Sequence, residues 1–275
     1  MRACKPIRYV PANPSGRDFV VGDIHGAFDL VIAAMKAVAF DRNVDRLFTV
    51  GDLIDRGAGS HRVHEFLAQP YVYSIRGNHE DELLNLYEDG SPSEDVLELA
   101  CQYNGLQWWL SVEPARRTEI IDALSRLPLV IELETPRGLV GFLHADVPQG
   151  MSWGVFRRAL LAGDERTRET CLWGRSRIKM RDQTGVPGIG RIFVGHTPNW
   201  KGIQRFGNVF AIDTAACFGQ NGLLPDGHLS LANVIMRTTS LTAPRQMPQL
   251  LIEIKDWDLV PDLPFGASGL LSPAT

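Results

Sequence analysis

The 275-residue chain is 44% hydrophobic and 22% charged, a composition typical of a soluble globular protein with a substantial core. Its formal net charge of −4 argues against a general nucleic-acid-binding protein, although a local arginine cluster for phosphate stays open. The four cysteines form no C-x-x-C pair, the N-terminus has no apolar signal segment, and no apolar run approaches the roughly 18 residues that span a bilayer. We therefore expect a cytoplasmic protein with free thiols and no membrane partner.

Residues 1–16 contain several prolines and a glycine, and we expect them to form a loose N-terminal arm. After this arm, short apolar strands alternate with helices at intervals of about 30 residues, which is typical of βαβ units. Such crossover connections predict parallel strands. The strands are expected at 17–23, 45–52 and 71–78, with helices at 27–40 and 59–70.

The second half of the chain has a different pattern. Residues 78–126 are expected to be mostly helical, and the stretch LPLVIELETPRGLVGFLHAD then predicts an antiparallel hairpin about its TPRG turn. This half should therefore form mixed or antiparallel sheet, with further strands at 190–196, 207–213 and 228–236. Residues 238–275 are rich in proline, threonine and serine and are expected to be an appended, partly ordered tail, in which PQLLIEI could add a strand.

Polar side chains follow the ends of five expected strands, in the motifs GDIHG, GDLIDRG, RGNHED, GFLHAD and FVGHTP. In open α/β sheets, functional groups gather outside the carboxyl ends of the strands. A single GD turn or buried histidine is more often structural, but its repetition at five strand ends favours a common site. We expect this site to contain Asp23, His25, Asp52, Asn78, His144 and His196.

These six side chains offer carboxylate, amide and imidazole ligands and no thiolate. Such a set suits Mn, Fe or Zn and differs from a structural cysteine-type zinc site. Six ligands exceed what one four-coordinate ion needs, and they suit two divalent ions about 3.5–4 Å apart that share a carboxylate. Asp52, from the middle strand, is the expected bridge. The other histidines are interpreted as ordinary helix or loop residues, namely His61, His64 and His228.

The motifs GDIHG, GDLIDRG, GNHE, a strand-final histidine and GHTP, in this order, resemble those of the metal-dependent phosphoprotein phosphatases. The resemblance covers about residues 17–216 and is greatest to the small phage and bacterial serine/threonine phosphatases, such as the lambda phage enzyme. It implies an α/β calcineurin-like metallophosphatase fold, with a central β-sandwich of mixed sheets built on βαβαβ units and flanked by helices. The catalytic domain would then comprise residues 17–237.

The resemblance implies two divalent ions, with Mn²⁺ expected and Fe or Zn as alternatives. Asp23, His25 and Asp52 would hold the first ion. The ligands of the second would be Asp52, Asn78, His144 and His196. In this family a water or hydroxide that bridges the ions attacks phosphorus in line, since bound metals can lower the pKa of water to about 7.

The resemblance also implies roles for residues outside the ligand set. His79 would be the general acid that protonates the leaving oxygen, and Asp55 the carboxylate that keeps it protonated. Arg56 and Arg175 would bind the phosphoryl oxygens, which arginine can do bidentately. Arg177 stays open as a substitute for Arg175, because alternate residues of an extended segment face the same side. Two positions carry no role: Arg76 is assigned no contact, and Ala215 stands where the family has glycine.

The expected reaction is hydrolysis of a phosphomonoester in a phosphorylated protein or peptide, on serine or threonine, with tyrosine and histidine left open. A symmetrical dinucleoside tetraphosphate hydrolase of the same fold is the alternative, which Asp55 and the GNHE motif disfavour. A nuclease or phosphodiesterase and a non-catalytic scaffold are disfavoured by the GHTP motif and by the complete ligand set. No nucleic-acid partner is expected, and the sequence does not determine the oligomeric state.

Overall fold

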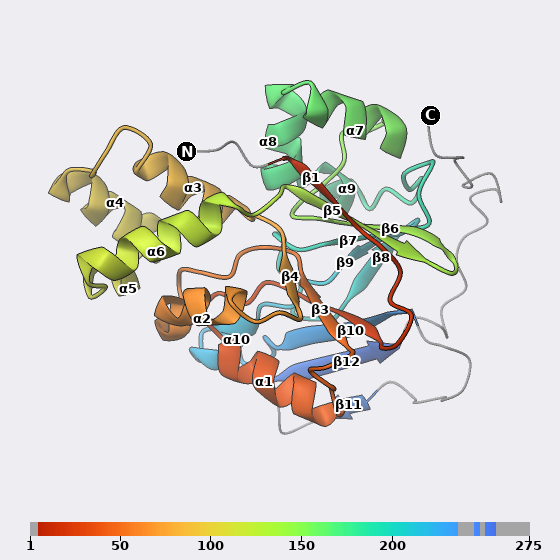
Figure 1. The fold of residues 1–275 in the computed structure, drawn as a ribbon, viewed down its shortest axis with the longest axis horizontal. Coiled ribbons are helices and arrows are strands. Elements are labelled where there is room, and N and C mark those ends of the chain that lie inside the picture. Colours follow the sequence, from red (N-terminus) through yellow and green to blue (C-terminus); the bar gives the residue numbers. More distant parts are fainter. Residues whose placement is uncertain (1–4, 236–244, 248–250, 257–275) are drawn as a thin grey trace.

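The computed structural model describes residues 5–235, 245–247 and 251–256. These residues form two six-stranded sheets with helices on their outer sides (Figure 1). The first sheet has the order β11-β12-β10-β2-β3-β4. Its strands are β2 (Asp18–Val21), β3 (Arg46–Thr49), β4 (Val72–Ser74), β10 (Leu229–Ile235), β11 (Arg245–Met247) and β12 (Ile252–Asp256).

The second sheet has the order β1-β5-β6-β7-β9-β8. Its strands are β1 (Ile7–Val10), β5 (Val130–Thr135), β6 (Gly138–Leu143), β7 (Arg191–Val194), β8 (Gln204–Phe206) and β9 (Val209–Ala211). β5 and β6 form the expected antiparallel hairpin, and β6, β7 and β9 run parallel. In the first sheet β2, β3 and β4 are parallel, as expected from their helical crossovers, and β10 is antiparallel to β2. The mixed architecture inferred from the sequence is therefore confirmed.

The two sheets pack face to face over a shared apolar core. This core combines side chains from both sheets, and Phe48 of β3 stacks on Phe142 of β6 with ring centroids 4.7 Å apart. Stacking continues across the second sheet through Phe193 and Phe210. Because both faces of each sheet are covered, the strands are continuous apolar runs rather than alternating ones. All four residues of β2 and of β7 are buried.

Helices cover both outer faces and one end of this sandwich (Figure 1). α1 (Phe28–Ala37) lies against β10 and β12, and α7 (Trp153–Leu161) lies against β1. The helices that gather at one end include α3, α4, α5 and α6 (Figure 1). The bounds of the remaining helices are η1 (Ala58–Arg62), α2 (Val63–Leu67), α3 (Asn78–Leu86), α4 (Glu94–Asn104), α5 (Gln107–Leu110), α6 (Pro114–Ser125), α8 (Glu165–Trp173), α9 (Ser176–Met180) and α10 (Ala216–Gln220). Among the described residues, no helix is both long and apolar enough to span a bilayer.

The structure differs from the expectation for the N-terminal arm and shows ordered strands in the tail. Ile7–Val10 is a strand that pairs in parallel with β5, so the expectation of a loose arm is wrong for these residues. The strand escaped notice because it is short and lies between Pro6 and Pro11. In the tail, β12 pairs in parallel with β10 and buries Ile252, which confirms the expected added strand. The rest of the tail beyond β11 and β12 lies outside the described residues.

The cysteines match the expectation of free thiols as far as the structure describes them. Cys101, Cys171 and Cys217 are free and buried, and Cys4 lies outside the described residues. Burial raises the pKa of the Cys171 thiol to about 12 and that of Cys217 to about 11. These thiols are therefore packing residues that stay protonated at neutral pH.

Candidate metal and phosphate site

The six expected ligand side chains meet at the ends of β2, β3, β4, β6 and β7, and each is at most 5% exposed. Asp52 lies at the centre of the group. Its Oδ2 atom is 3.5 Å from Nε2 of His25, and its Oδ1 atom is 3.4 Å from Nε2 of His144. The Oδ1 atom of Asn78 is 2.8 Å from Nε2 of His144 and 2.8 Å from Nδ1 of His196. The two carboxylate oxygens of Asp52 therefore face two different sets of side chains.

Asp23 completes the group from the loop after β2. Its Oδ2 atom accepts a hydrogen bond of 2.8 Å from the backbone N–H of His196. Its Oδ1 atom is buried and has no hydrogen-bond partner among the described residues, and the same holds for Nε2 of His196. Burial, and then the neighbouring Asp213 and Asp52, raise the pKa of the Asp23 carboxyl. Buried polar atoms without partners are costly, so these two atoms are suited to bind a cation.

The local backbone is strained where it presents these ligands. Among the described residues, eight that are not glycine have positive φ, and five of them are His25 (43°), Asp52 (49°), Asp55 (70°), Arg56 (64°) and His196 (68°). Each such residue costs about 1–3 kcal/mol, and such strain clusters at functional sites. The sequence patterns GD-x-H-G and GD-x-x-D-R-G thus encode tight turns that aim polar groups inward.

Two glycines allow the backbone to approach the carboxylates. A Cβ atom at Gly195 would lie 1.9 Å from Oδ1 of Asp23, and one at Gly77 would lie 2.3 Å from Oδ1 of Asp52. Real Cβ atoms do not approach oxygen so closely, so any other residue would displace the carboxylate. This steric demand explains the glycine that precedes His196 and the glycine that precedes Asn78.

The Nδ1 hydrogen bonds of His25 and His144 direct the lone pair of each Nε2 atom toward the ligand group. Nδ1 of His25 is 2.7 Å from the carbonyl of Ile54, and Nδ1 of His144 is 2.7 Å from the carbonyl of Val50. A carbonyl can only accept, so Nδ1 carries the proton and Nε2 keeps its lone pair. Burial lowers the pKa of both imidazoles, and burial with His144 and Arg175 lowers the pKa of His196 to about 3. All three rings are neutral at physiological pH.

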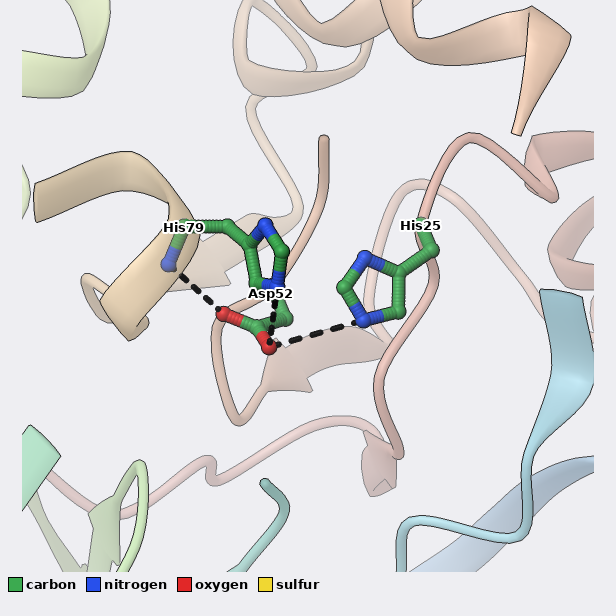
Figure 2. Close-up of side chains that lie close together, drawn as sticks. All are labelled: His25, Asp52 and His79. Atoms are coloured by element: carbon green, nitrogen blue, oxygen red, sulfur yellow. Dashed lines mark hydrogen bonds and ion pairs between the residues drawn. The ribbon is translucent and has the colours of Figure 1, made fainter. Parts of the chain in front are cut away.

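His79 lies on the other side of Asp52 from His144 and is held differently. Figure 2 shows Asp52 between the rings of His79 and His25, with Nε2 of His79 4.0 Å from Oδ2 of Asp52. Nδ1 of His79 donates to Oδ2 of Asp55 at 2.7 Å, and Oδ1 of Asp55 accepts from the indole N–H of Trp108 at 2.7 Å. Burial alone would lower the pKa of His79, but Asp52 and Asp55 outweigh it and raise this pKa above its ordinary value.

Glu80 is a positioning residue that the sequence analysis did not identify. It is fully buried, and its carboxylate accepts backbone N–H bonds from Gly77 (2.7 Å), Asp52 (2.9 Å) and Leu53 (2.8 Å). These bonds join the loop after β3 to the first turn of α3, and they fix Asp52 relative to Asn78. Burial, with the nearby charge of Asp52, raises the pKa of Glu80 to about 7. Its place three residues after Gly77, where a helix-capping glutamate is common, was the available signal.

The two expected arginines border the ligand group. Nη1 of Arg56 is 2.6 Å from Nε2 of His25, and its guanidinium lies over the ring of Phe218. Nη1 of Arg175 donates to the hydroxyl of Thr197 at 3.2 Å, one residue from His196. The side chain of Arg56 is exposed and that of Arg175 partly exposed, so both guanidinium groups can reach an entering anion.

Arg177 is not an equivalent of Arg175. The segment is the helix α9 and not an extended chain, so the two arginines do not share a side. Arg177 is 4% exposed, its Nε atom donates to Asp146 at 3.0 Å, and Nη1 pairs with Asp182. The alternative left open by the sequence is therefore wrong, and Arg177 is a buried structural cation.

Three further residues near the site were not identified from the sequence. Trp108 is 53 positions from Asp55 along the chain, and the ring centroids of Trp173 and His196 are 5.6 Å apart in an edge-to-face arrangement. Asp213 is buried behind Asp23, and burial raises its pKa to about 6. Its carboxylate accepts the backbone N–H of Ala215, whose φ of 66° is a conformation that glycine adopts more readily, in keeping with the glycine that the resemblance implies there. No local sequence motif indicates that the two tryptophans lie near the site.

Two groups of side chains among the described residues have the geometry to hold a metal ion, and they share Asp52. One group is His25, Asp52 and His79, and the other is Asp52, His144 and His196, with the ligand atoms within 4.8 Å of one another. The neutral imidazoles, the partnerless Oδ1 of Asp23 and the central carboxylate all fit divalent cations. None of the histidines interpreted as ordinary residues belongs to either group.

Comparison with known proteins places the chain in a class. Residues 19–221 match the family described as calcineurin-like phosphoesterase. The chain therefore belongs to the calcineurin-like metallophosphoesterases, and it is a hydrolase with the metallophosphatase fold expected from its motifs.

The chain is also similar to individual members of this family. It is 32% identical over 219 residues to serine/threonine-protein phosphatase 1 of Salmonella typhimurium, covering 78% of this chain and 91% of that protein. It is 31% identical over 204 residues to serine/threonine-protein phosphatase 2 of Escherichia coli, covering 72% of this chain and 87% of that protein. A shorter match, 39% over 71 residues and 25% of each chain, is to a symmetrical bis(5'-nucleosyl)-tetraphosphatase of Serratia proteamaculans.

Among solved structures, a putative diadenosine tetraphosphatase has the same fold. It aligns with a TM-score of 0.56 and 24% sequence identity, covering 84% of this chain and 94% of that chain. Likeness at this identity concerns the fold and leaves the substrate open.

Proposed function

We propose that the protein is a phosphoprotein phosphatase that hydrolyses phosphoserine and phosphothreonine with the help of two divalent cations. The observation that carries this proposal is the pairing of His79 with Asp55 beside the shared carboxylate of Asp52. A cationic imidazole next to an anion-binding centre is suited to protonate an alkoxide, which is a poor leaving group. The resemblance over most of the chain to bacterial serine/threonine-protein phosphatases supports the same reaction.

The residues fit two cations that share Asp52. Asp23, His25 and Asp52 would hold the first. The second would be held by Asp52, Asn78, His144 and His196. His79 has its Nδ1 atom engaged by Asp55 and its pKa raised, so we assign it outside both coordination shells. The donor set accepts several metals, and we propose Mn²⁺, with Fe or Zn as the alternatives.

The residues of the chain divide the remaining work of the reaction. When bound, the cations would supply Lewis-acid polarisation of the phosphoryl group and a source of hydroxide near neutral pH. Arg56 and Arg175 bind and orient the phosphoryl oxygens from two sides, and their charge offsets the charge that develops on those oxygens. Glu80 holds the loop of Asp52 in register with Asn78.

His79 moves the proton. The proton on Nδ1 is held in the hydrogen bond to Asp55. The proton on Nε2 faces Asp52 and is therefore the one that can be donated to the leaving oxygen. Asp55 stabilises the imidazolium before donation, and Trp108 fixes Asp55. General-acid catalysis of this kind contributes about 10²–10⁴-fold.

A dinucleoside tetraphosphate hydrolase is the second candidate, because relatives of that name match part of the chain. That match spans 25% of the chain, whereas the phosphatase of Salmonella typhimurium matches 78% of it. Another tetraphosphatase relative matches 53% of the chain, which is still less than the phosphatase match. Phosphoprotein is therefore the substrate class that we propose.

The two candidates are separated by rates on three substrates with Mn²⁺ present. A phosphoserine peptide, a phosphotyrosine peptide and diadenosine tetraphosphate are compared at equal concentration with the same enzyme preparation. We expect the largest kcat/KM on the phosphoserine peptide. A larger kcat/KM on diadenosine tetraphosphate than on both peptides would overturn the proposed function in favour of the second candidate.

A further inference from the structure

A cavity of about 380 Å³ opens beside the His79–Asp55 pair. Its walls come from α3, the end of α4 and the residue before α5, and they include Asp55, Glu82, Leu86, Ala100 and Asn104. These helices belong to the group at one end of the sandwich in Figure 1. Because Asp55 both lines the cavity and binds Nδ1 of His79, the cavity is one residue removed from the proposed general acid.

The position of the cavity assigns it to one part of the substrate. In hydrolysis of a phosphomonoester, the general acid protonates the oxygen that leaves with the polypeptide. The polypeptide therefore extends from the His79 side of the phosphoryl group. The backbone N–H of Arg56 donates to the carbonyl of Gly105 at 2.9 Å, which fastens the turn between α4 and α5 to the phosphate-binding loop. This turn and the cavity therefore lie next to the side from which the polypeptide would extend.

The charge in the cavity is negative and only partly compensated. Asp55 is paired with His79 and accepts a hydrogen bond from the indole N–H of Trp108. Glu82 is partly exposed, and no hydrogen bond or ion pair within the described part of the chain engages its carboxylate. Burial raises the pKa of Glu82 above its ordinary value, as expected for a carboxylate without a counterion. Asn85 also lines the cavity but donates to Asp81, so Glu82 and Asn104 are the polar groups of the lining that are available for a ligand.

The surrounding sequence extends this charge. Residues 77–115 contain nine aspartate and glutamate residues and no lysine or arginine. Aliphatic walls together with a carboxylate that has no counterion match the stem and the charged head of an arginine or lysine side chain. An acidic side chain would meet repulsion from Glu82, and an uncharged one would leave Glu82 unpaired.

We propose that this cavity is a specificity subsite that receives a basic side chain flanking the phosphorylated residue, with Glu82 as its ion-pair partner. The proposal rests on the proposed function, since it requires a polypeptide as the leaving group. It makes the enzyme selective for phosphoserine or phosphothreonine close in sequence to arginine or lysine. Glu82 is thereby a binding residue for the substrate and takes no part in the chemistry.

The test compares phosphoserine peptides that differ at one flanking position. Arginine, norleucine or glutamate is placed at each of the three positions on either side of phosphoserine, and kcat/KM is measured with Mn²⁺ at low ionic strength. In the unmodified enzyme we expect at least one position at which arginine is favoured over norleucine by roughly 5- to 10-fold, the size of one partly shielded ion pair. Glutamate at the same position should be disfavoured.

Variants assign the preference to Glu82. Glu82→Gln should reduce the arginine-to-norleucine ratio to about 1, and Glu82→Lys should favour glutamate at that position. Glu98→Gln is the matched control. Glu98 is exposed on α4 and does not line the cavity, so this substitution removes the same charge at a different place. The ratio is an internal measure within each variant, so a general loss of activity does not affect it.

The outcomes separate the subsite from the proposed function. Equal kcat/KM for all peptides, or an arginine preference that Glu82→Gln leaves intact, overturns the subsite while the phosphatase function stands. Hydrolysis of diadenosine tetraphosphate with no peptide hydrolysed overturns both. An arginine preference that Glu98→Gln abolishes and Glu82→Gln preserves overturns the assignment to the cavity.

Discussion

His144 and His79 approach different oxygens of the same carboxylate, yet the structure shifts the pKa values of the two imidazoles in opposite directions, down for His144 and up for His79. Both rings are buried, and both lie within 4.0 Å of Asp52. The difference comes from the partner of Nδ1, which is the backbone carbonyl of Val50 for His144 and the carboxylate of Asp55 for His79. A carbonyl orients the ring and leaves it neutral, while a carboxylate favours the imidazolium. The same residue type thus serves as a cation ligand on one side and as a proton donor on the other.

Removing the charge that both sides share should have the largest effect. Asp52→Asn keeps the shape of the side chain but takes the anion from both metal groups, so we expect metal affinity to fall by more than about 100-fold and activity to fall with it. Metal content after dialysis and kcat with excess Mn²⁺ measure the two effects. Asp81→Asn is the control, since Asp81 is a buried carboxylate of α3 that pairs with Arg76 and Arg168 outside the metal groups. Full metal content in Asp52→Asn would contradict the bridging role.

Replacing the carboxylate that binds Nδ1 of His79 should lower the pKa of this histidine and favour its neutral form. In Asp55→Asn one of the two anions that raise the pKa of His79 is lost and Asp52 remains, so this pKa falls and the imidazolium disappears at a lower pH. We expect kcat on a phosphoserine peptide at pH 8 to fall by roughly 10- to 100-fold, and the alkaline decline of kcat to move to lower pH. The pH profile of kcat measures the shift.

A matched variant separates charge from orientation in this pair. Trp108→Phe removes one hydrogen bond from Asp55 and leaves its carboxylate beside His79. Its alkaline decline should therefore move less than that of Asp55→Asn. Identical pH profiles for the unmodified enzyme and Asp55→Asn would show that Asp55 does not set the protonation of His79.

Backbone strain at the site permits a smaller test. Ala215 has φ of 66° but binds no proposed ligand, unlike the strained Asp52 and His196. In Ala215→Gly, relief of about 1–2 kcal/mol of strain offsets the lost methyl group and the added chain entropy, so the free energy of unfolding should change by less than about 0.5 kcal/mol. Ala216→Gly, in the buried first position of α10, should cost about 1–2 kcal/mol. Equal losses in urea denaturation would show that Ala215 is unstrained.

The sequence predicted much of this site because its residues follow a simple spatial rule. Asp23, Asp52 and Asn78 come after parallel strands, and parallel strands deliver their carboxyl ends to one edge. His144 and His196 follow β6 and β7 of the facing sheet, and the packing of the two sheets brings them to the same edge. Periodicity and strand-end position were sufficient for this part.

What the sequence did not predict depends on contacts between distant segments or on local conformation. Trp108 reaches Asp55 only because α5 packs beside the loop after β3, and no spacing encodes that contact. The role of Glu80 lies in backbone N–H groups that belong to a turn of unusual φ. Arg177 was misjudged because a five-residue helix has too short a period to recognise. β1 was missed because four residues between prolines carry no alternation.

The most direct test of the two-histidine account is the metal content and kcat of His79→Asn and His144→Asn, measured on the same preparations by mass spectrometry and with a phosphoserine peptide. His79→Asn should keep the metal content of the unmodified protein and lose about 10²–10⁴-fold in kcat, because it removes a proton donor. His144→Asn should lose metal together with activity, because it removes a ligand. Loss of metal from His79→Asn, or retention of its full kcat, would contradict the division between ligand and acid.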